Sequence, residues 1–287
     1  MLISTEINSS SSRIGFEKAV EAVANAGFDA WDFSLFRMAP FDGKTHSVKL
    51  SGHPLESREA LAYARKLKQI GLDNGIFCNQ SHAPFPVAIP AIWDKVRLAI
   101  EATAEAGGKI CVIHPFHDNT PEENGQVYAD LLPFAKECGV ILATENMWYW
   151  NNELDQAKDA ACSHHDNFRA TMDALDDPFF TACLDIGHAE MKGLRTSAVE
   201  MIYALRGRLG ALHIHDNDRR HDSHQIPFSM NIDFVPIVKA LKEIGYAGEF
   251  TLEADAYLSS FPVEEIPAKL KDLADSARRL AEIFEKA

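Results

Sequence analysis

Short apolar runs alternate with longer amphipathic runs along the whole chain. The short runs are rich in β-branched and aromatic residues and are bounded by glycine, proline or polar turns, a pattern that predicts strands. These strands are expected at residues 2–7, 29–35, 75–82, 109–115, 140–146, 180–186, 209–215 and 248–254. The longer runs repeat apolar residues at helical spacing, as Phe234, Ile237 and Leu241 do, and so predict helices. The helices are expected at residues 15–26, 56–74, 91–106, 122–138, 165–176, 196–207, 233–244 and 263–286.

Several expected helices end beside a glycine that can turn the chain into the next strand. Gly27, Gly71, Gly139 and Gly245 lie at such ends, and glycine accepts the left-handed backbone that caps a helix. Eight strand–helix units in strict alternation predict a parallel sheet, and eight is the number that closes a (β/α)8 TIM barrel. A doubly wound open sheet is the alternative, but no glycine-rich phosphate loop follows any expected strand. No linker divides the chain, so residues 1–287 are expected to form a single α/β domain.

The composition is that of an ordinary globular protein, with 46% apolar and 24% charged residues. The net charge of −14 disfavours nonspecific contact with nucleic acid or with an anionic membrane surface. No apolar run of roughly 18 residues is present, so no membrane span is expected. The chain shows no signal-peptide pattern, and its five cysteines lack CxxC spacing. These features predict reduced thiols and a cytoplasmic location.

Histidines and acids stand at the carboxyl ends of six successive expected strands. These strands end at or near His82, His114, Glu145, Asp185, His213 and Glu253, and the loops beyond add His188, Asp222 and His224. Barrel enzymes place their active residues at this end of the strands. Carboxylates combined with imidazoles suit manganese, magnesium, cobalt or zinc in a site left partly open to substrate. We therefore expect a divalent metal site at this rim.

The motifs that carry these residues resemble those of one group of proteins. SHAP, IHP, TEN, LDIGH, LHIHDN, DSH and LEAD, in this order, resemble the xylose-isomerase-like barrel superfamily. That superfamily includes sugar and sugar-phosphate isomerases and epimerases, inosose-type enzymes and the endonuclease IV family. For the epimerase branch, the resemblance implies one metal ion held by Glu145, Asp185, His213 and Glu253. It also implies substrate contacts from His188 and Arg219, and we expect His82, His114 and Trp148 to line the substrate cavity, although Trp148 could equally pack its own loop.

The activity implied by this branch is isomerisation or epimerisation of a small carbohydrate: a sugar, a sugar phosphate or a cyclitol. A divalent cation would stabilise the enediolate as negative charge develops. Glu145 and Glu253 would be the catalytic acid and base that remove and return the proton. The sequence leaves open which glutamate acts first, whether the substrate is phosphorylated and whether the protein forms a homo-oligomer.

The endonuclease IV branch implies a different activity, cleavage of DNA at abasic sites by three zinc ions. Its nine ligand positions are all filled here, by His82, His114, Glu145, Asp185, His188, His213, Asp222, His224 and Glu253. His82, His114, His188, Asp222 and His224 would then be additional metal ligands.

Three observations weigh against this phosphodiesterase. The chain is strongly acidic, the segment after SHAP reads FPVAIP in place of a tyrosine-bearing loop, and the 36–54 loop holds only Arg37, Lys44 and Lys49 as basic residues. A metal-dependent isomerase or epimerase is therefore favoured. A dehydratase, a lyase or a non-catalytic relative remains a further alternative.

Overall fold

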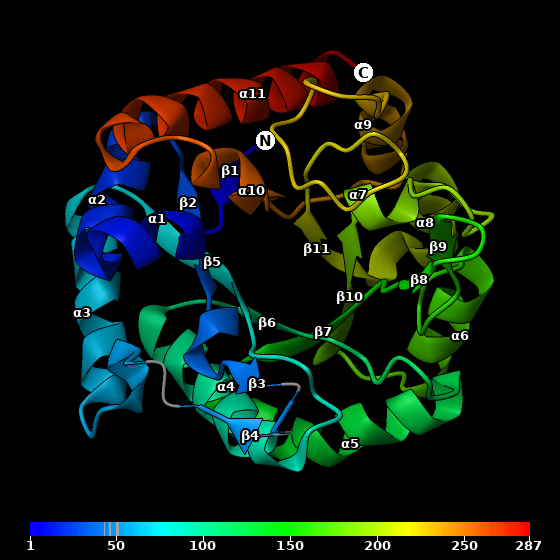
Figure 1. Ribbon diagram of the computed structural model, residues 1–287, viewed down its shortest axis with the longest axis horizontal. Helices are drawn as coiled ribbons and strands as arrows, with labels where there is room; N and C mark the ends of the chain where they lie inside the picture. Colours follow the sequence, from blue (N-terminus) through cyan, green and yellow to red (C-terminus); the bar gives the residue numbers. More distant parts are fainter. Residues whose placement is uncertain (43, 46, 50–51) are drawn as a thin grey trace.

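Eight parallel strands curl into a barrel in the computed structural model, which describes residues 1–287 except 43, 46 and 50–51 (Figure 1). Six strands form one sheet in the order β11–β10–β7–β6–β5–β2, and β1 pairs with β12. Their bounds are β1 Ile3–Thr5, β2 Ala30–Ser34, β5 Phe77–His82, β6 Ile110–Ile113, β7 Ile141–Glu145, β10 Phe180–Asp185, β11 Leu209–His213 and β12 Phe250–Leu252. Single bridges from Glu6 to Asp32 and from Ile214 to Leu252 join the two sheets. The predicted TIM barrel is confirmed.

An outer ring of helices covers the barrel (Figure 1). The expected helices are all present, as α2 Phe16–Ala26, α3 Ala60–Asp73, α4 Trp93–Ala106, α5 Pro121–Cys138, α6 His165–Ala174, α8 Ala198–Leu205, α9 Phe234–Glu243 and α11 Ile266–Lys286. Helix α5 begins at a capping box, in which the Thr120 hydroxyl accepts from the Glu123 amide and the Glu123 side chain accepts from the Thr120 amide. Among the described residues, none of the helices has the length and the apolar character that crossing a bilayer requires.

The sequence pattern did not predict the short elements at the strand-to-helix connections. They are brief or, like α1, almost wholly polar, so they show no apolar periodicity. They include the helices α1 Asn8–Ile14, α7 Ile186–Ala189 and α10 Asp255–Ser259, and the hairpins β3–β4 (Phe41–Asp42, Ser47–Val48) and β8–β9 (Tyr149–Asn151, Gln156–Lys158). Single 3-10 turns occur at η1 Phe36–Met38, η2 Pro54–Glu56, η3 Pro90–Ile92, η4 Arg206–Arg208 and η5 Val263–Glu265. Helices α7 and α10 follow β10 and β12 at once, so they shape the mouth of the barrel.

One of the four expected helix-end glycines has a different role. Gly27 and Gly139 adopt left-handed φ values of 98° and 70° at the ends of α2 and α5, and Gly245 follows α9 with a φ of 73°. Gly71 instead lies inside α3. A β-carbon there would lie 2.9 Å from Trp31 Nε1, so glycine allows α3 to pack closely on β2. The expectation that Gly71 ends a helix is wrong.

Two separate cores fill the two sides of the strands. Between strands and helices lies a continuous apolar core whose largest fully buried side chains include Trp31, Tyr128, Phe33 and Phe168. Inside the barrel, small side chains form a separate cluster of Val112, Ala143, Cys183 and Ala211. Asn79 bonds across the interior to Ser4 (2.7 Å) and Thr251 (3.0 Å). The described side chains therefore fill the barrel beneath its mouth.

Candidate active site

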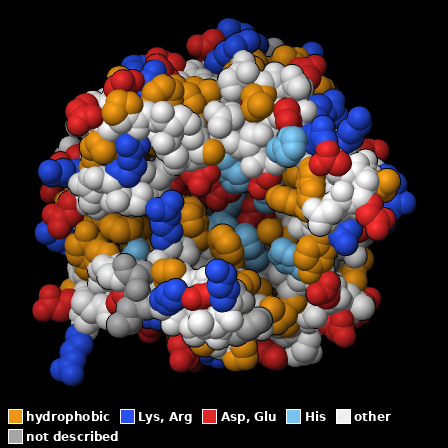
Figure 2. Space-filling view, viewed as in Figure 1, with side chains coloured by type: hydrophobic (Ala, Val, Ile, Leu, Met, Phe, Trp, Pro, Cys, Tyr) orange, Lys and Arg blue, Asp and Glu red, His pale blue; other side chains and the backbone are white. Residues whose placement is uncertain are grey.

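The loops that follow the strands enclose a cavity of about 330 Å³ at the mouth of the barrel. Figure 2 shows histidine and acidic side chains gathered in a hollow at the centre of this face. The cavity is lined by Phe36, His82, Phe85, His114, His117, Glu145, Met147, Trp148, His188, Asp222, His224, Glu253 and Asp255. Most of the predicted site residues are among them. Asp185 and His213 are buried beneath the cavity, in contact with its lining.

The carboxylate of Glu145, at the end of β7, is surrounded by three imidazoles. Its Oε1 lies 2.8 Å from His213 Nδ1, and its Oε2 lies 3.3 Å from His114 Nε2 and 3.4 Å from His82 Nε2. The Nε2 atoms of His82 and His114 are 3.0 Å apart. Because His82 Nδ1 donates to the Ala83 carbonyl at 2.8 Å, a neutral His82 presents the lone pair of Nε2 to this cluster. Ligand-type atoms from three residues thus converge at one point.

Burial and neighbouring charges set the protonation of this cluster. Burial acts to keep a proton on Glu145, but the imidazoles of His213, His114 and His82 hold the pKa of its carboxyl well below the usual range. Burial lowers the pKa of His114 to about 4, so this ring is neutral at neutral pH and keeps a lone pair. An ionised carboxylate beside a neutral imidazole is the combination that a divalent cation requires.

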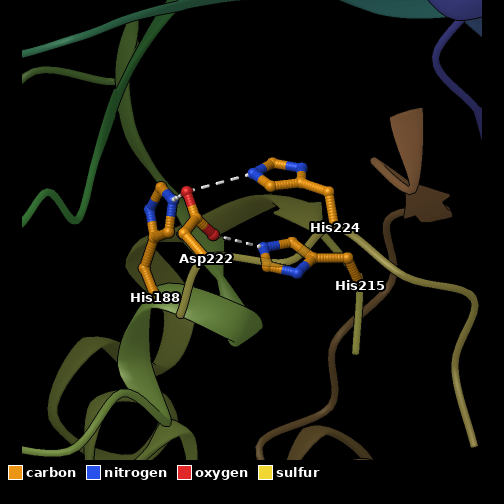
Figure 3. Close-up of side chains that lie close together, drawn as sticks. All are labelled: His188, His215, Asp222 and His224. Carbon is orange, nitrogen blue, oxygen red and sulfur yellow. Dashed lines mark hydrogen bonds and ion pairs between the residues drawn. The ribbon is translucent and has the colours of Figure 1, made fainter. Parts of the chain in front are cut away.

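Asp222 forms a second cluster with three further imidazoles (Figure 3). Its Oδ2 lies 3.2 Å from both His188 Nε2 and His224 Nε2, and its Oδ1 lies 3.4 Å from His215 Nε2. His188 comes from α7, His215 lies just beyond β11, and Asp222 and His224 belong to the loop that leads to α9. Figure 3 shows these side chains pointing toward one another. The fold thus brings His188 of α7 against residues of the segment that follows β11.

Backbone carbonyls fix the orientation of two of these rings. His188 Nδ1 donates to the Asn146 carbonyl at 2.9 Å, and His224 Nδ1 donates to the Glu253 carbonyl at 2.7 Å. With Nδ1 engaged in this way, Nε2 is left to face the cavity. Metal-binding histidines in proteins are held by the same kind of bond from their second ring nitrogen.

Asp185, the last residue of β10, lies between the two clusters. It is fully buried, and its Oδ1 lies 3.2 Å from His215 Nε2 and accepts the His188 backbone amide at 2.7 Å. Asn146 clamps the Asp185 backbone, since its side chain donates to the Asp185 carbonyl (2.9 Å) and accepts the Asp185 amide (2.8 Å). Although burial acts against protonation, Asp185 and Asp222 raise the pKa of His188 to about 10. His188 therefore holds a proton that a metal cation would displace.

Several buried polar atoms in these clusters have no hydrogen-bond partner in the described part of the chain. They are Glu145 Oε2, Asp185 Oδ2, Asp222 Oδ1 and the Nε2 atoms of His213 and His215. Each unsatisfied buried polar atom lowers stability by about 1–3 kcal/mol. Their concentration in one place therefore indicates that a bound ligand satisfies them. Carboxylate oxygens and imidazole nitrogens are donors that divalent metal ions bind. The residues present therefore fit a divalent metal ion.

His215 is a site residue that the sequence analysis missed. It is fully buried and its ring reaches Asp185, whereas His213 lies deeper in the barrel between Glu145 and Asp32. Side chains two positions apart on a strand share a face. The LHIHDN motif therefore already contained the signal that both histidines point into the barrel.

The two remaining predicted substrate contacts, Trp148 and Arg219, differ in their position relative to the cavity. Trp148 lines the cavity, and its ring centroid lies 6.2 Å from that of His188. Arg219 does not line the cavity. It is paired with Glu190 at 3.0 Å and borders a neighbouring surface pocket together with Lys192. The structure thus brings Trp148 to the site and leaves Arg219 outside it.

Buried Asp216 fixes the loop that carries Asp222 and His224. The loop leaves β11 and returns to α9, and Asp216 lies at its start with no exposed surface. Its carboxylate accepts hydrogen bonds of 2.8, 2.8 and 3.0 Å from the backbone amides of Asn217, Met230 and Ile232. One side chain therefore ties both ends of the loop together and sets the position of the second cluster.

Residues 20–283 match the model of the xylose isomerase-like TIM barrel family. The chain belongs to this family. The resemblance drawn from the sequence motifs is thereby confirmed. A curated relative, an uncharacterized protein of Methanocaldococcus jannaschii, is 25% identical over 190 residues. This match covers 60% of the chain and 62% of the relative, so the chain spans less than two thirds of the length of the curated relative it matches.

Solved structures of sugar epimerases share the fold. A D-tagatose 3-epimerase-like protein is 20% identical, with a TM-score of 0.71 over 100% of this chain and 99% of that chain. An L-ribulose 3-epimerase is 18% identical, with a TM-score of 0.69 over 99% of this chain and 95% of that chain. Likeness at these identities establishes the barrel, and the activity has to be argued from the site itself.

Proposed function

We propose that this protein is a divalent-metal-dependent isomerase or epimerase of a small carbohydrate. The observation that carries the proposal is the convergence of Glu145, Asp185, Glu253 and buried imidazoles, several with unsatisfied ligand atoms, on one cavity. The cavity volume of about 330 Å³ falls in the range of small-molecule sites. The shared fold of solved sugar epimerases supports the same activity.

Glu145, Asp185 and Glu253 are the carboxylates that would hold the metal ion. Two imidazoles compete for the remaining position. His213, the sequence-based choice, lies 2.8 Å from Glu145 and 3.4 Å from Glu253, and its Nε2 faces Asp32. We favour His215, because its Nε2 lies between two carboxylates, those of Asp185 and Asp222. The Nε2 atom of His215 has no hydrogen-bond partner among the described residues and lies 3.2 Å from Asp185 Oδ1. That is the separation expected between two atoms bound to one cation with bonds of about 2.0–2.2 Å.

His213 is better placed to orient Glu145 than to bind metal. Its Nδ1 is hydrogen-bonded to Glu145 at 2.8 Å, and its Nε2 faces Asp32 at 3.7 Å. Although burial acts against protonation, the acidic groups of Cys183, Glu253 and Glu145 raise the pKa of His213 well above its usual range. That proton, like the one on His188, would have to leave before the ring could bind a metal ion.

The two glutamates reach the cavity from β7 and from the residue after β12, so they can flank a bound sugar. When bound, a divalent cation supplies stabilisation for the negative charge that develops as a carbon-bound proton next to a carbonyl is removed. Burial raises the pKa of Glu253, which makes its carboxylate a stronger base toward that proton. Glu145 remains ionised. His188 lines the same cavity and can hold a substrate oxygen.

The lining of the cavity bears on the charge of the substrate. None of the described residues that line it is a lysine or an arginine, whereas Glu145, Asp222, Glu253 and Asp255 supply carboxylates. A phosphate group gains most from the fixed donors of arginine or lysine. We therefore infer an uncharged sugar or cyclitol rather than a sugar phosphate.

Proton exchange tests this function. The metal-loaded protein, incubated in deuterated water with neutral ketoses and cyclic polyol ketones, is expected to place deuterium on the carbon next to the carbonyl. Glu253→Gln removes the acid–base group and is expected to abolish exchange while the circular dichroism spectrum is unchanged. If no member of a broad panel of neutral substrates exchanges deuterium in the wild-type protein, the proposed function is wrong.

A trinuclear phosphodiesterase is a second candidate, because the structure gathers all nine predicted ligands at one mouth. His82 and His114 lie against Glu145, and His188 and His224 lie against Asp222. The net charge of −14 and the lack of basic residues in the described lining weigh against a nucleic acid substrate. Metal analysis separates the two: a ratio near one ion per chain supports the isomerase, and a ratio near three with nicking of abasic DNA supports the phosphodiesterase.

A further inference from the structure

A second cavity of about 380 Å³ adjoins the candidate active site. It shares Phe85, His114, His117 and Met147 with the lining of the central cavity. The remaining lining residues are Pro86, Val87, Ala88, Pro115, Phe116, Asp118, Asn119 and Tyr149. They come from the segments after β5, β6 and β7, so the second cavity lies beside the first at the mouth of the barrel, with the shared residues between the two.

The second cavity carries fewer charged groups than the first. Among the described lining residues it has one carboxylate, that of Asp118, whereas the central cavity has four. Its walls are mostly apolar, and Val87 and Met147 are buried in them. The polar groups are partly engaged with one another, since the Tyr149 hydroxyl donates to Asp118 at 3.0 Å. None of the described lining residues is a lysine or an arginine. Such a chamber offers apolar contact and gives few hydrogen bonds to a hydroxylated group.

Phe85 and His114 form the boundary between the two chambers. Their rings are stacked, with centroids 4.6 Å apart and planes inclined by 19°. Phe85 is nevertheless 39% exposed, and it lines both cavities. An exposed aromatic ring of this kind gains free energy when a ligand covers it.

We propose that the substrate has two parts: a hydroxylated ring that binds in the central cavity, and an uncharged apolar group of about ring size that binds in the second chamber. This inference rests on the proposed function and specifies its substrate class as a carbohydrate that bears an apolar substituent. The carbonyl that proton transfer requires belongs to the carbohydrate part, because, of the two cavities and among the described residues, it is the central one that holds carboxylates within ligand distance of imidazoles. The apolar part stays attached and takes no part in the proton transfer, so its contribution is to affinity.

Equilibrium binding of matched probes tests the second chamber without requiring turnover. The probes are methyl and phenyl β-D-glucopyranoside, with the methyl and phenyl β-D-galactopyranosides as a second pair, and titration calorimetry on the metal-loaded protein gives Kd. In at least one pair, the phenyl glycoside is expected to bind at least tenfold more tightly than the methyl glycoside. Equal affinities within each pair, or no binding of any probe at millimolar concentration, would overturn the proposal.

Substitutions at Ala88 locate the effect. Ala88 is exposed and lines only the second chamber, so Ala88→Trp is expected to fill that chamber, keep the fold and reduce the phenyl advantage to less than threefold. Ala88→Asp, a smaller change, is expected to reduce the advantage by placing a charge against the apolar group. Ala247→Trp is the matched control, because Ala247 is exposed in the turn before β12, at the opposite end of the barrel. A phenyl advantage that survives both Ala88 variants would overturn the proposal, whereas deuterium exchange with simple ketoses would still support the proposed function.

Discussion

His213 and His215 leave the same segment of chain two positions apart and reach different carboxylates. His213 Nδ1 lies 2.8 Å from Glu145 Oε1, and His215 Nε2 lies 3.2 Å from Asp185 Oδ1. The regular advance of a strand places one ring above the other in the barrel. One imidazole can therefore orient a carboxylate while the next one binds the cation.

Metal affinity should separate these two roles. His215→Ala is expected to weaken metal binding at least a hundredfold, because it deletes a ligand. His213→Gln is expected to weaken binding by about tenfold, because the amide can still donate to Glu145 and only the orientation suffers. Competition with a fluorescent chelator measures both affinities. If His213→Gln loses the metal and His215→Ala keeps it, the sequence-based choice of His213 as ligand is the correct one.

Gly187 should prove essential for the position of His215. A β-carbon built on Gly187 would overlap the imidazole ring of His215, because α7 begins directly against that ring. Gly187→Ala is therefore expected to displace the ring and weaken metal binding by about tenfold or more. Gly207→Ala is the matched control, since a β-carbon there has nothing within 4 Å. Wild-type metal affinity in the Gly187 variant would show that the ring position does not matter.

Stability should fall with rising pH because of Glu6. This residue is buried and accepts the Ser9 backbone amide at 3.0 Å. Burial, reinforced by the charge of Asp255, raises its pKa to about 8, compared with about 4.3 in an unfolded chain. Between these values the folded protein holds a proton that the unfolded chain has released, so this contribution is complete below about pH 4 and is lost as pH rises toward 8.

Urea unfolding of the metal-free protein from pH 5 to pH 9 measures this effect. Glu6→Gln keeps an acceptor for the Ser9 amide and cannot ionise, so it is expected to remove part of the pH dependence and to be the more stable protein at pH 9, by a few kcal/mol at most. Parallel stability curves for the two proteins would show that Glu6 does not titrate in this range.

His188 and Arg219 should differ sharply in their effect on turnover. His188 lines the cavity beside Asp222, 3.2 Å away, so His188→Ala is expected to lower kcat/KM by at least tenfold, roughly the 1.5–3 kcal/mol of a hydrogen bond to a charged group. Arg219 is paired with Glu190 outside the cavity, so Arg219→Ala is expected to change kcat/KM less than threefold. Metal content of the His188 variant shows whether this ring also binds an ion. A large loss in the Arg219 variant would mean that the loop after β11 closes over the substrate.

Asp216→Asn should loosen the loop that carries Asp222 and His224. The amide can accept fewer hydrogen bonds from the three backbone amides than the carboxylate does, and its NH₂ group faces donors. We expect a loss of about 1–3 kcal/mol in stability and faster hydrogen exchange in residues 217–232. The matched control is Asp233→Asn, which changes an exposed acid at the start of α9. Equal exchange in both variants would contradict the anchoring role.

The barrel could be predicted from the sequence because strands alternate with helices whose apolar residues recur at regular spacing, as those from Phe234 to Leu241 do. The sequence was also sufficient for the side chains at strand ends, since a parallel barrel brings all carboxyl ends to one rim. It could not place Arg219, because the position of a side chain within a long loop depends on contacts such as those of Asp216. His215 lies beyond the last ladder bond of β11, so a strand that ends at His213 does not by itself predict it, although the side-chain period of two continues past that bond.

The pairing of β1 with β12 has a consequence for the order in which the protein folds. Six strands pair with partners that are near neighbours in sequence, whereas Ile3 pairs with Phe250 from the other end of the chain. Bringing such distant segments together carries the largest loop-closure cost and is kinetically slow. Glu253 follows β12 directly, so the imidazoles can assemble around Glu145 before the proposed acid–base group arrives. Full metal affinity and activity would then appear only with the last folding event, the closure of the barrel.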